Sequence, residues 1–188
     1  MANRNTQGFG LVAAGTLGST PATSGQGKYK IDAGYGTTIY NGGAVASAAG
    51  YIVEGQGTDT PILGVLNGIF YNAATTLKPT FANAYIATIT PANSEDTDAF
   101  VFDNPQQQYV VATDAAVAQS GFLETYDMNT TAGSDTTGKS SATLDIGDTS
   151  ADAASWRLSR SAEDPENEDI TAAFASVVVV ANLIELQS

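Results

Sequence analysis

The chain has 188 residues, of which 43% are hydrophobic and 14% charged, and it contains neither cysteine nor histidine. That composition excludes disulfide bonds, thiolate nucleophiles, imidazole bases and zinc sites of the common ligand types. The formal net charge is −13, from 7 basic and 20 acidic residues, and because phosphate backbones repel such a chain we expect no nucleic-acid partner.

The polar residues indicate the fold class. Helical proteins usually solvate themselves with Glu, Lys and Arg, whereas this chain uses mainly Thr, Ser, Asn, Gln and Asp, which are typical of strands' edges and turns. We therefore predict an all-β fold, a β-barrel or sandwich of short antiparallel strands with long polar loops and an extended N-terminal arm.

Residues 1–27 are expected to form that arm, because they are rich in Gly, Ser and Thr and show no sustained periodicity. The first 31 residues contain three basic residues and no acid (+3), whereas residues 32–188 carry four basic residues and all 20 acids (−16). An acid-free arm with a few apolar side chains suits attachment to an acidic surface. A disordered tail and an edge strand are the alternatives.

Residues 28–71 show the spacing of several strands. Lys28–Asp32 alternates in polarity, and Asn41-Gly42-Gly43 is typical of a hairpin turn. A second Asn-Gly pair, Asn67-Gly68, predicts another turn. The expected strands are 28–32, 37–41, 44–47, 51–54, 61–66 and 69–71.

The rest of the chain continues this pattern, with strands about ten residues apart, as in sandwiches and barrels. Residues 28–188 are predicted to be a single β-barrel-like domain, with two small lobes split near 72–80 as an alternative. The expected strands are 80–90, 99–103, 108–113, 121–128, 141–146, 155–160 and 176–186, with one helical turn at 115–119, an acidic turn at 94–98, a polar loop at 129–140 and an acidic loop at 161–169.

One segment matches a nucleotide-binding motif. Gly133 to Ser140 fits the phosphate-loop pattern G-x-x-x-x-G-K-[ST], which needs a buried strand before it and a helix after it. Here the preceding segment is polar, the following segment is typical of a strand, and Asp135 has the wrong charge for a phosphate site. We interpret the match as chance and expect no nucleotide or other cofactor.

Two clusters of carboxylates and the single tryptophan need interpretation. The clusters, around 95–98 and 163–169, lack the spacing of a calcium loop, so solvated turns are favoured over a structural cation or a catalytic pair. No arrangement marks an activated nucleophile, and we expect no enzymatic activity. Trp156, flanked by Arg157 and Arg160, is either a core residue or an interface anchor.

Five blocks of sequence cover most of the chain: Gly8-Phe-Gly-Leu with Tyr29 to Val45, Ile62 to Tyr71, Phe102 to Val111, Thr137 to Asp145, and Trp156 to Arg160 followed by Asp164-Pro-Glu-Asn and a final apolar strand. Taken together, these blocks resemble the head decoration (capsid cement) proteins of tailed bacteriophages. Gly43 stands where that family usually has aspartate, and Asn104 where it has a second acid before proline.

The resemblance implies a structural virion protein that is made in the host cytoplasm and decorates and stabilises the outer surface of a bacteriophage capsid. Its partners would be the major capsid protein and other copies of itself, most simply in a homotrimer. We expect no membrane partner, because the most apolar run, 177–186, is too short to span a bilayer. The alternative is a virion-surface adhesion module that binds carbohydrate without stabilising the capsid. Candidate capsid or subunit contacts are Arg4, Phe9, Leu11, Val12, Leu17, Lys28, Lys30, Trp156, Arg157 and Arg160.

Overall fold

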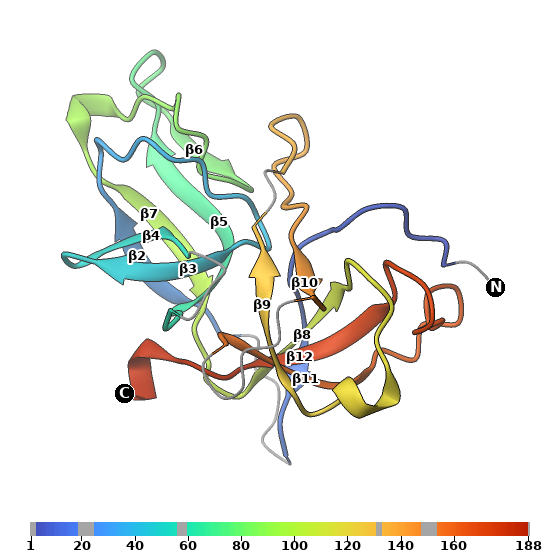
Figure 1. Ribbon diagram of the computed structural model, residues 1–188. Helices are drawn as coiled ribbons and strands as arrows, with labels where there is room; N and C mark the ends of the chain where they lie inside the picture. Colours follow the sequence, from blue (N-terminus) through green and yellow to red (C-terminus); the bar gives the residue numbers. More distant parts are fainter. Residues whose placement is uncertain (1–2, 19–24, 56–59, 131–132, 148–153, 188) are drawn as a thin grey trace.

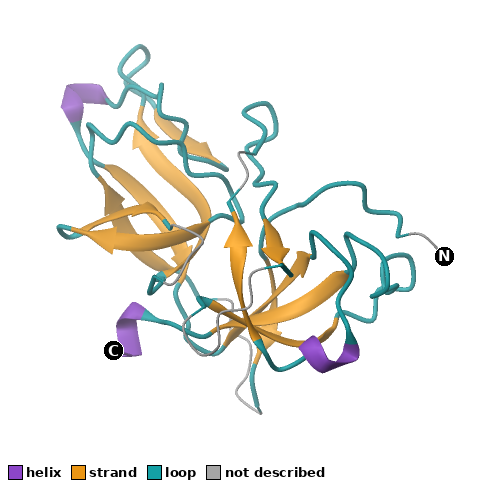
Figure 2. Cartoon of the chain, in the orientation of Figure 1, coloured by secondary structure: helices purple, strands orange, loops and turns teal. Residues whose placement is uncertain are grey.

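A computed structural model describes residues 3–18, 25–55, 60–130, 133–147 and 154–187. Within these ranges the regular structure consists of strands and three short 3-10 turns, η1 (Ala92–Ser94), η2 (Gln119–Gly121) and η3 (Glu185–Gln187). Figure 2 shows how far strands and loops dominate the chain. The all-β prediction is confirmed.

The strands form two antiparallel six-stranded sheets, and neither closes into a barrel, so the arrangement is consistent with a sandwich. The two sheets lie in the lower right and upper left parts of Figure 1. The first sheet has the order β1 (Val12–Thr16), β8 (Gln107–Ala112), β12 (Ser176–Ala181), β11 (Trp156–Ser161), β9 (Thr125–Asn129) and β10 (Thr143–Asp145).

The second sheet is built from one continuous stretch of chain. Within the predicted split region 72–80, residues 73–78 join two strands of this one sheet, and the chain passes to the first sheet at residues 103–106. Its order is β2 (Gly27–Ile31), β7 (Thr97–Phe102), β5 (Gly64–Asn72), β3 (Ala44–Ala48) and β4 (Tyr51–Glu54), and β6 (Pro79–Ala82) pairs with the distal half of β5.

Each sheet has its own apolar core, and the two cores share a wall. Along β5, Val65 packs into the core of the first sheet and the next residue, Leu66, into that of the second. Ala44 and Val45 at the start of β3 divide in the same way. Because successive side chains of a strand point to opposite faces, these strands separate two cores and belong to both.

An aromatic pair joins the core of the first sheet to the end of β7. The ring of Trp156 is fully buried and meets the ring of Tyr109 edge-on, with centroids 5.6 Å apart and an interplanar angle of 88°. The Tyr109 hydroxyl donates a hydrogen bond of 3.0 Å to the carbonyl oxygen of Phe102. Burial raises the pKa of this phenol, so it keeps its proton and remains a donor.

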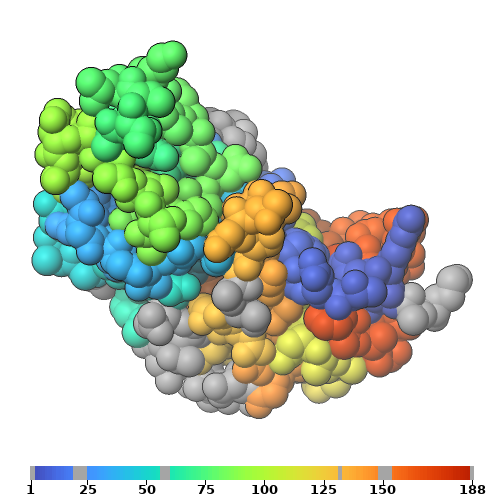
Figure 3. All heavy atoms as spheres, turned by 90° about the horizontal axis from the view of Figure 1, so that it is seen from above, coloured from blue at the N-terminus to red at the C-terminus, as the bar shows by residue number. Residues whose placement is uncertain are grey.

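The described part of the N-terminal segment lies on the body instead of extending from it. Residues 12–16 form β1 and pair with β8 at the edge of the first sheet. This part of the predicted arm is therefore an edge strand. Asn3 donates to the carbonyl of Ala173 at 2.9 Å. A side chain at Gly8 would collide with the carbonyl of Ser141, which shows how closely the N-terminal segment packs on the body. Figure 3 shows the blue N-terminal segment against the orange and red C-terminal part.

Three local expectations need correction. The Asn67-Gly68 pair is not a turn: β5 runs through it, and the irregularity appears as a shift in register against β7. The predicted strand at 80–90 ends at Ala82, because the backbone of Tyr85 pairs instead with Ile39. The predicted strand at 37–41 is reduced to isolated bridges for the same reason.

We predict that Leu11→Ala destabilises the protein by about 2–4 kcal/mol, because Leu11 is 4% exposed and lies in the core of the first sheet. The matched control is the next residue: Val12→Ala should cost less than about 1 kcal/mol, since Val12 is 52% exposed. Denaturant unfolding measures both. Equal small costs would contradict the placement of residue 11 in the core.

Candidate functional site

The structure divides the predicted contact residues into buried and exposed groups. Leu11 and Trp156 are core residues and are therefore unavailable to a partner. Phe9 is partly exposed, and Val12 and Leu17 are the large apolar side chains that are exposed in the described part of the N-terminal segment.

The basic residues are largely engaged within the chain. Lys28 and Lys30 project from β2 and reach the two carboxylate oxygens of Asp98 at 2.7 and 2.6 Å. Burial alone would raise the pKa of Asp98, but the hydrogen bonds from the two lysines outweigh it and lower the pKa. Lys28, Lys30 and Asp98 together carry one net positive charge.

The arginines have internal partners as well. Arg4 pairs with Glu166 at 2.5 Å, and both side chains are well exposed, so the pair contributes little to stability. Arg157 donates to the carbonyl of Leu123 at 2.7 Å and to the side-chain oxygen of Asn182 at 3.1 Å. The Arg157 guanidinium thereby ties the loop at Leu123 to Asn182. The side chain of Arg160 is exposed.

The outer edge of β1 is the exposed feature of the first sheet that fits the sequence prediction. We call the exposed side chains of Val12, Ala14 and Leu17 with this strand edge the β1 edge. β1 is the terminal strand of its sheet, and within the described ranges no strand pairs with its outer side. The strand has no charged residue.

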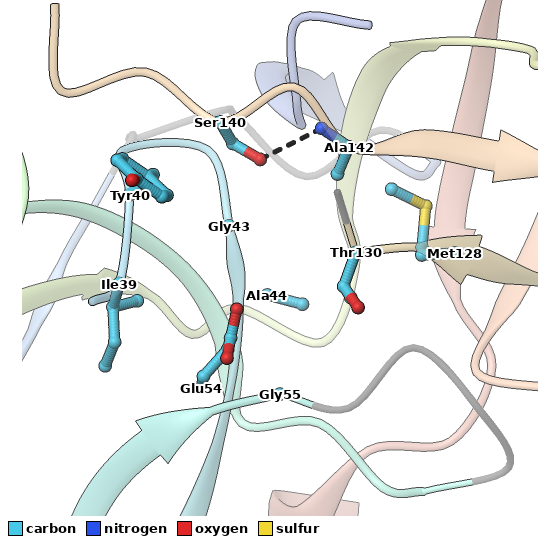
Figure 4. Close-up of a pocket in the computed structure, with 10 residues that line it drawn as sticks. All are labelled: Ile39, Tyr40, Gly43, Ala44, Glu54, Gly55, Met128, Thr130, Ser140 and Ala142. Carbon is cyan, nitrogen blue, oxygen red and sulfur yellow. Dashed lines mark hydrogen bonds between the residues drawn. The ribbon is translucent and has the colours of Figure 1, made fainter. Parts of the chain in front are cut away.

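A small cavity lies where the two sheets meet (Figure 4). It is lined on one side by Tyr40, Ala44 and Glu54, and on the other by Met128 and Ser140. Its volume of about 20 Å³ leaves room for about one water molecule. The Glu54 carboxyl is half-buried there, and burial raises its pKa. This space is a packing feature and is too small for an organic substrate.

The phosphate-loop match folds as a tight turn closed by an isolated bridge between Ser134 and Lys139. The amide of Ser134 donates to the carbonyl of Lys139 at 2.9 Å, and the chain continues to the strand β10 instead of a helix. The Tyr40 hydroxyl donates to Asp135 at 2.6 Å. The helix N-terminus on which a phosphate loop relies is missing from this segment.

The carboxylates of the acidic loop are used locally. Asp164 accepts hydrogen bonds from the Asn167 side chain at 2.8 Å and from the Glu166 amide at 3.2 Å, which lower its pKa. Asp169 accepts from Thr171 at 2.6 Å. These are the short-range bonds typical of Asp in turns. Among the described residues, no three or more carboxylates are grouped as metal ligands would be.

Sequence reasoning missed a surface on the second sheet. Phe81 on β6 is 73% exposed, and its ring lies 4.7 Å from that of Phe70 on β5. Beside it is a groove of about 370 Å³, which we call the aromatic groove; its main lining residues are Gln26, Asn67, Gly68, Phe81, Asn83 and Phe100. Phe70, Phe81 and Phe100 are visible in the sequence, but the strand register that brings them to one face is not.

No protein-family model, curated protein or solved structure matches this chain. Within the described ranges, the structure also has no helix with the length and apolar character needed to cross a bilayer.

We predict that Glu54→Gln stabilises the protein at neutral pH and raises Tm by about 1 °C. Burial raises the folded-state pKa of Glu54 above its ordinary value of 4.5. The Glu54 carboxyl therefore contributes less to the free energy of unfolding as the pH rises from 4.5 through the folded-state pKa. The gain should disappear below pH 4.5. Thermal unfolding at pH values below and above 4.5 checks the effect. Glu168→Gln is the control for net charge, because Glu168 is an exposed acid. An equal gain in both variants would contradict a role for burial.

Proposed function

We propose that this protein is a structural component of a bacteriophage particle, which binds the outer surface of the capsid and stabilises it. The observation that carries the proposal is the β1 edge, an uncharged, partly apolar strand edge in a protein of net charge −13. The sequence blocks that resemble head decoration proteins point in the same direction.

The physical case for attachment rests on the outer side of β1, with which no other described strand pairs. A sheet edge presents unsatisfied backbone donors and acceptors, and proteins usually protect such edges with charge, proline or a bulge. β1 has a register shift between Ala13 and Gly15 but neither charge nor proline. An extended segment of the major capsid protein could add to this edge, while Val12 and Leu17 supply apolar contacts.

Charge supports the outward placement. The interior of a DNA-filled shell is strongly negative, so a body with a net charge of −16 over residues 32–188 is favoured outside it. The acid-free first 31 residues would then face the shell with the least repulsion.

We predict that Val12→Glu weakens binding to purified capsids at least about tenfold, since it places a charge in an apolar contact. Co-sedimentation with capsids that lack this protein measures the affinity. Leu77→Glu is the matched control, because Leu77 is 71% exposed on the turn between β5 and β6 of the other sheet. Both variants should keep the wild-type circular dichroism spectrum.

Two results would count against this proposal. Wild-type protein that fails to bind capsids would reject the decoration function. Capsid binding that is unaffected by Val12→Glu but lost with Leu77→Glu would reject the β1 edge as the attachment surface.

We further predict that the capsid-free protein assembles into a homotrimer. A chain without disulfides gains stability by burying open strand edges between copies, and three-fold positions are abundant on icosahedral shells. Because each copy carries −13, association should strengthen with added salt. Light scattering should give three times the 19.3 kDa chain mass; a monomer at tens of micromolar would contradict a preformed trimer.

A further inference from the structure

The aromatic groove follows from the register of the second sheet. Phe81 on β6 lies directly opposite Phe70 on β5, and Phe100 on β7 lies opposite Gly68 on β5. Directly opposite residues of antiparallel strands project from the same face, as do positions two apart along a strand. The three phenylalanines therefore share one face, with a glycine between them.

Gly68 keeps the floor of the groove open. It has no side chain where Phe70 and Phe100 on the same face have rings, and a Cβ added there would come within 3.1 Å of the Ala82 carbonyl oxygen. The resulting hollow of about 370 Å³ is within the size range of small-molecule sites.

The wall formed by Phe81 is both exposed and fixed. Its ring packs on Phe70 at 4.7 Å, with an interplanar angle of 48°, so it cannot fold away without losing that contact. A 73% exposed phenyl ring costs solvation free energy in the isolated chain. A ligand that covers the ring would recover this free energy, and the platform needs little reorganisation to accept it.

The polar part of the groove consists of carboxamides. Within the described part of the chain, no hydrogen bond engages the side chains of Gln26 and Asn83, and that of Asn67 has only a 3.5 Å contact with Asn41. A carboxamide both donates and accepts, so it can pair with hydroxyl groups in either orientation. No charged side chain lines the groove.

We propose that the aromatic groove binds a neutral sugar, a hexopyranose unit of a glycan. The C–H face of the ring would stack on Phe81, and the hydroxyl groups would bind the carboxamides. A charged ligand fits less well, because no side chain of opposite charge lines the groove. The site lies on a different sheet from the β1 edge, so sugar binding can be tested separately from capsid attachment.

Titration followed by NMR tests the site on the free full-length protein. The probes are methyl α-glucopyranoside, methyl β-galactopyranoside and N-acetylglucosamine, with glucuronate as the charged comparison. We expect at least one neutral probe to shift the side-chain NH₂ signals of Gln26, Asn67 and Asn83. Because no ion pair is involved, the affinity should not change with salt.

Variants assign the interaction to the stacking platform. Phe81→Ala should weaken binding at least about tenfold, whereas Phe81→Trp should retain it because the aromatic face is preserved. Leu77→Ala, another exposed apolar position outside the groove, should bind like the wild type.

Three outcomes would overturn the proposal. The first is the absence of shifts with every neutral probe, and the second is equal affinity of Phe81→Ala and wild type. The third is loss of capsid binding in Phe81→Ala without any response to sugars, which would make the groove a protein interface. Capsid binding by wild-type protein that ignores sugars would leave the decoration function standing while rejecting the glycan site.

Discussion

The alternation of side chains along β3 and β5 is the constraint on which both sheets depend. Ala44 and Val65 face the core of the first sheet, and their neighbours Val45 and Leu66 face that of the second. The same division occurs just before β5, between Ile62 and Leu63. A slip of one residue would exchange the two sets of side chains, so neither core can form in the wrong register without disturbing the other.

This shared wall explains how a chain without disulfides holds two sheets together. The Tyr109 hydroxyl adds a directed link, because it bonds to the carbonyl at the end of β7 while its ring packs on Trp156. The N-terminal segment adds a third link. Leu11 lies in the core of the first sheet, and its amide donates to the carbonyl of Gly42 just before β3. The space left at the junction is about 20 Å³, enough for about one water molecule, as expected of a packed interior.

Much of the fold could be predicted from local patterns, and the failures have physical reasons. Alternating stretches such as 28–32 and compact apolar ones such as 108–113 coincide closely with β2 and β8, because polarity period and burial agree there. Asn67-Gly68 has the composition of a turn but lies within a strand held between β6 and β7. Leu11 lies in a Gly-rich stretch without periodicity, so only the tertiary structure reveals its core position.

The functional surfaces were less predictable for a related reason. The cationic character of Lys28 and Lys30 is visible in the sequence, but their common partner Asp98 lies on another strand and becomes adjacent only through the register of β2 and β7. Similarly, Phe70, Phe81 and Phe100 are dispersed along the chain, and pairing of three strands brings them to one face. The proposed decoration function rests on the resemblance in sequence and on the character of the β1 edge.

The different origins of the two sheets also bear on how the chain folds during synthesis. All strands of the second sheet lie between residues 27 and 102, so that sheet can pair as soon as this stretch has left the ribosome. The first sheet joins β1, near the start of the chain, to strands as late as β12 at 176–181. Such distant pairings close slowly, so the apolar face of β8 stays uncovered until translation is nearly complete. The sheet that contains the β1 edge is thus the last to form and the most exposed to misassembly with other copies.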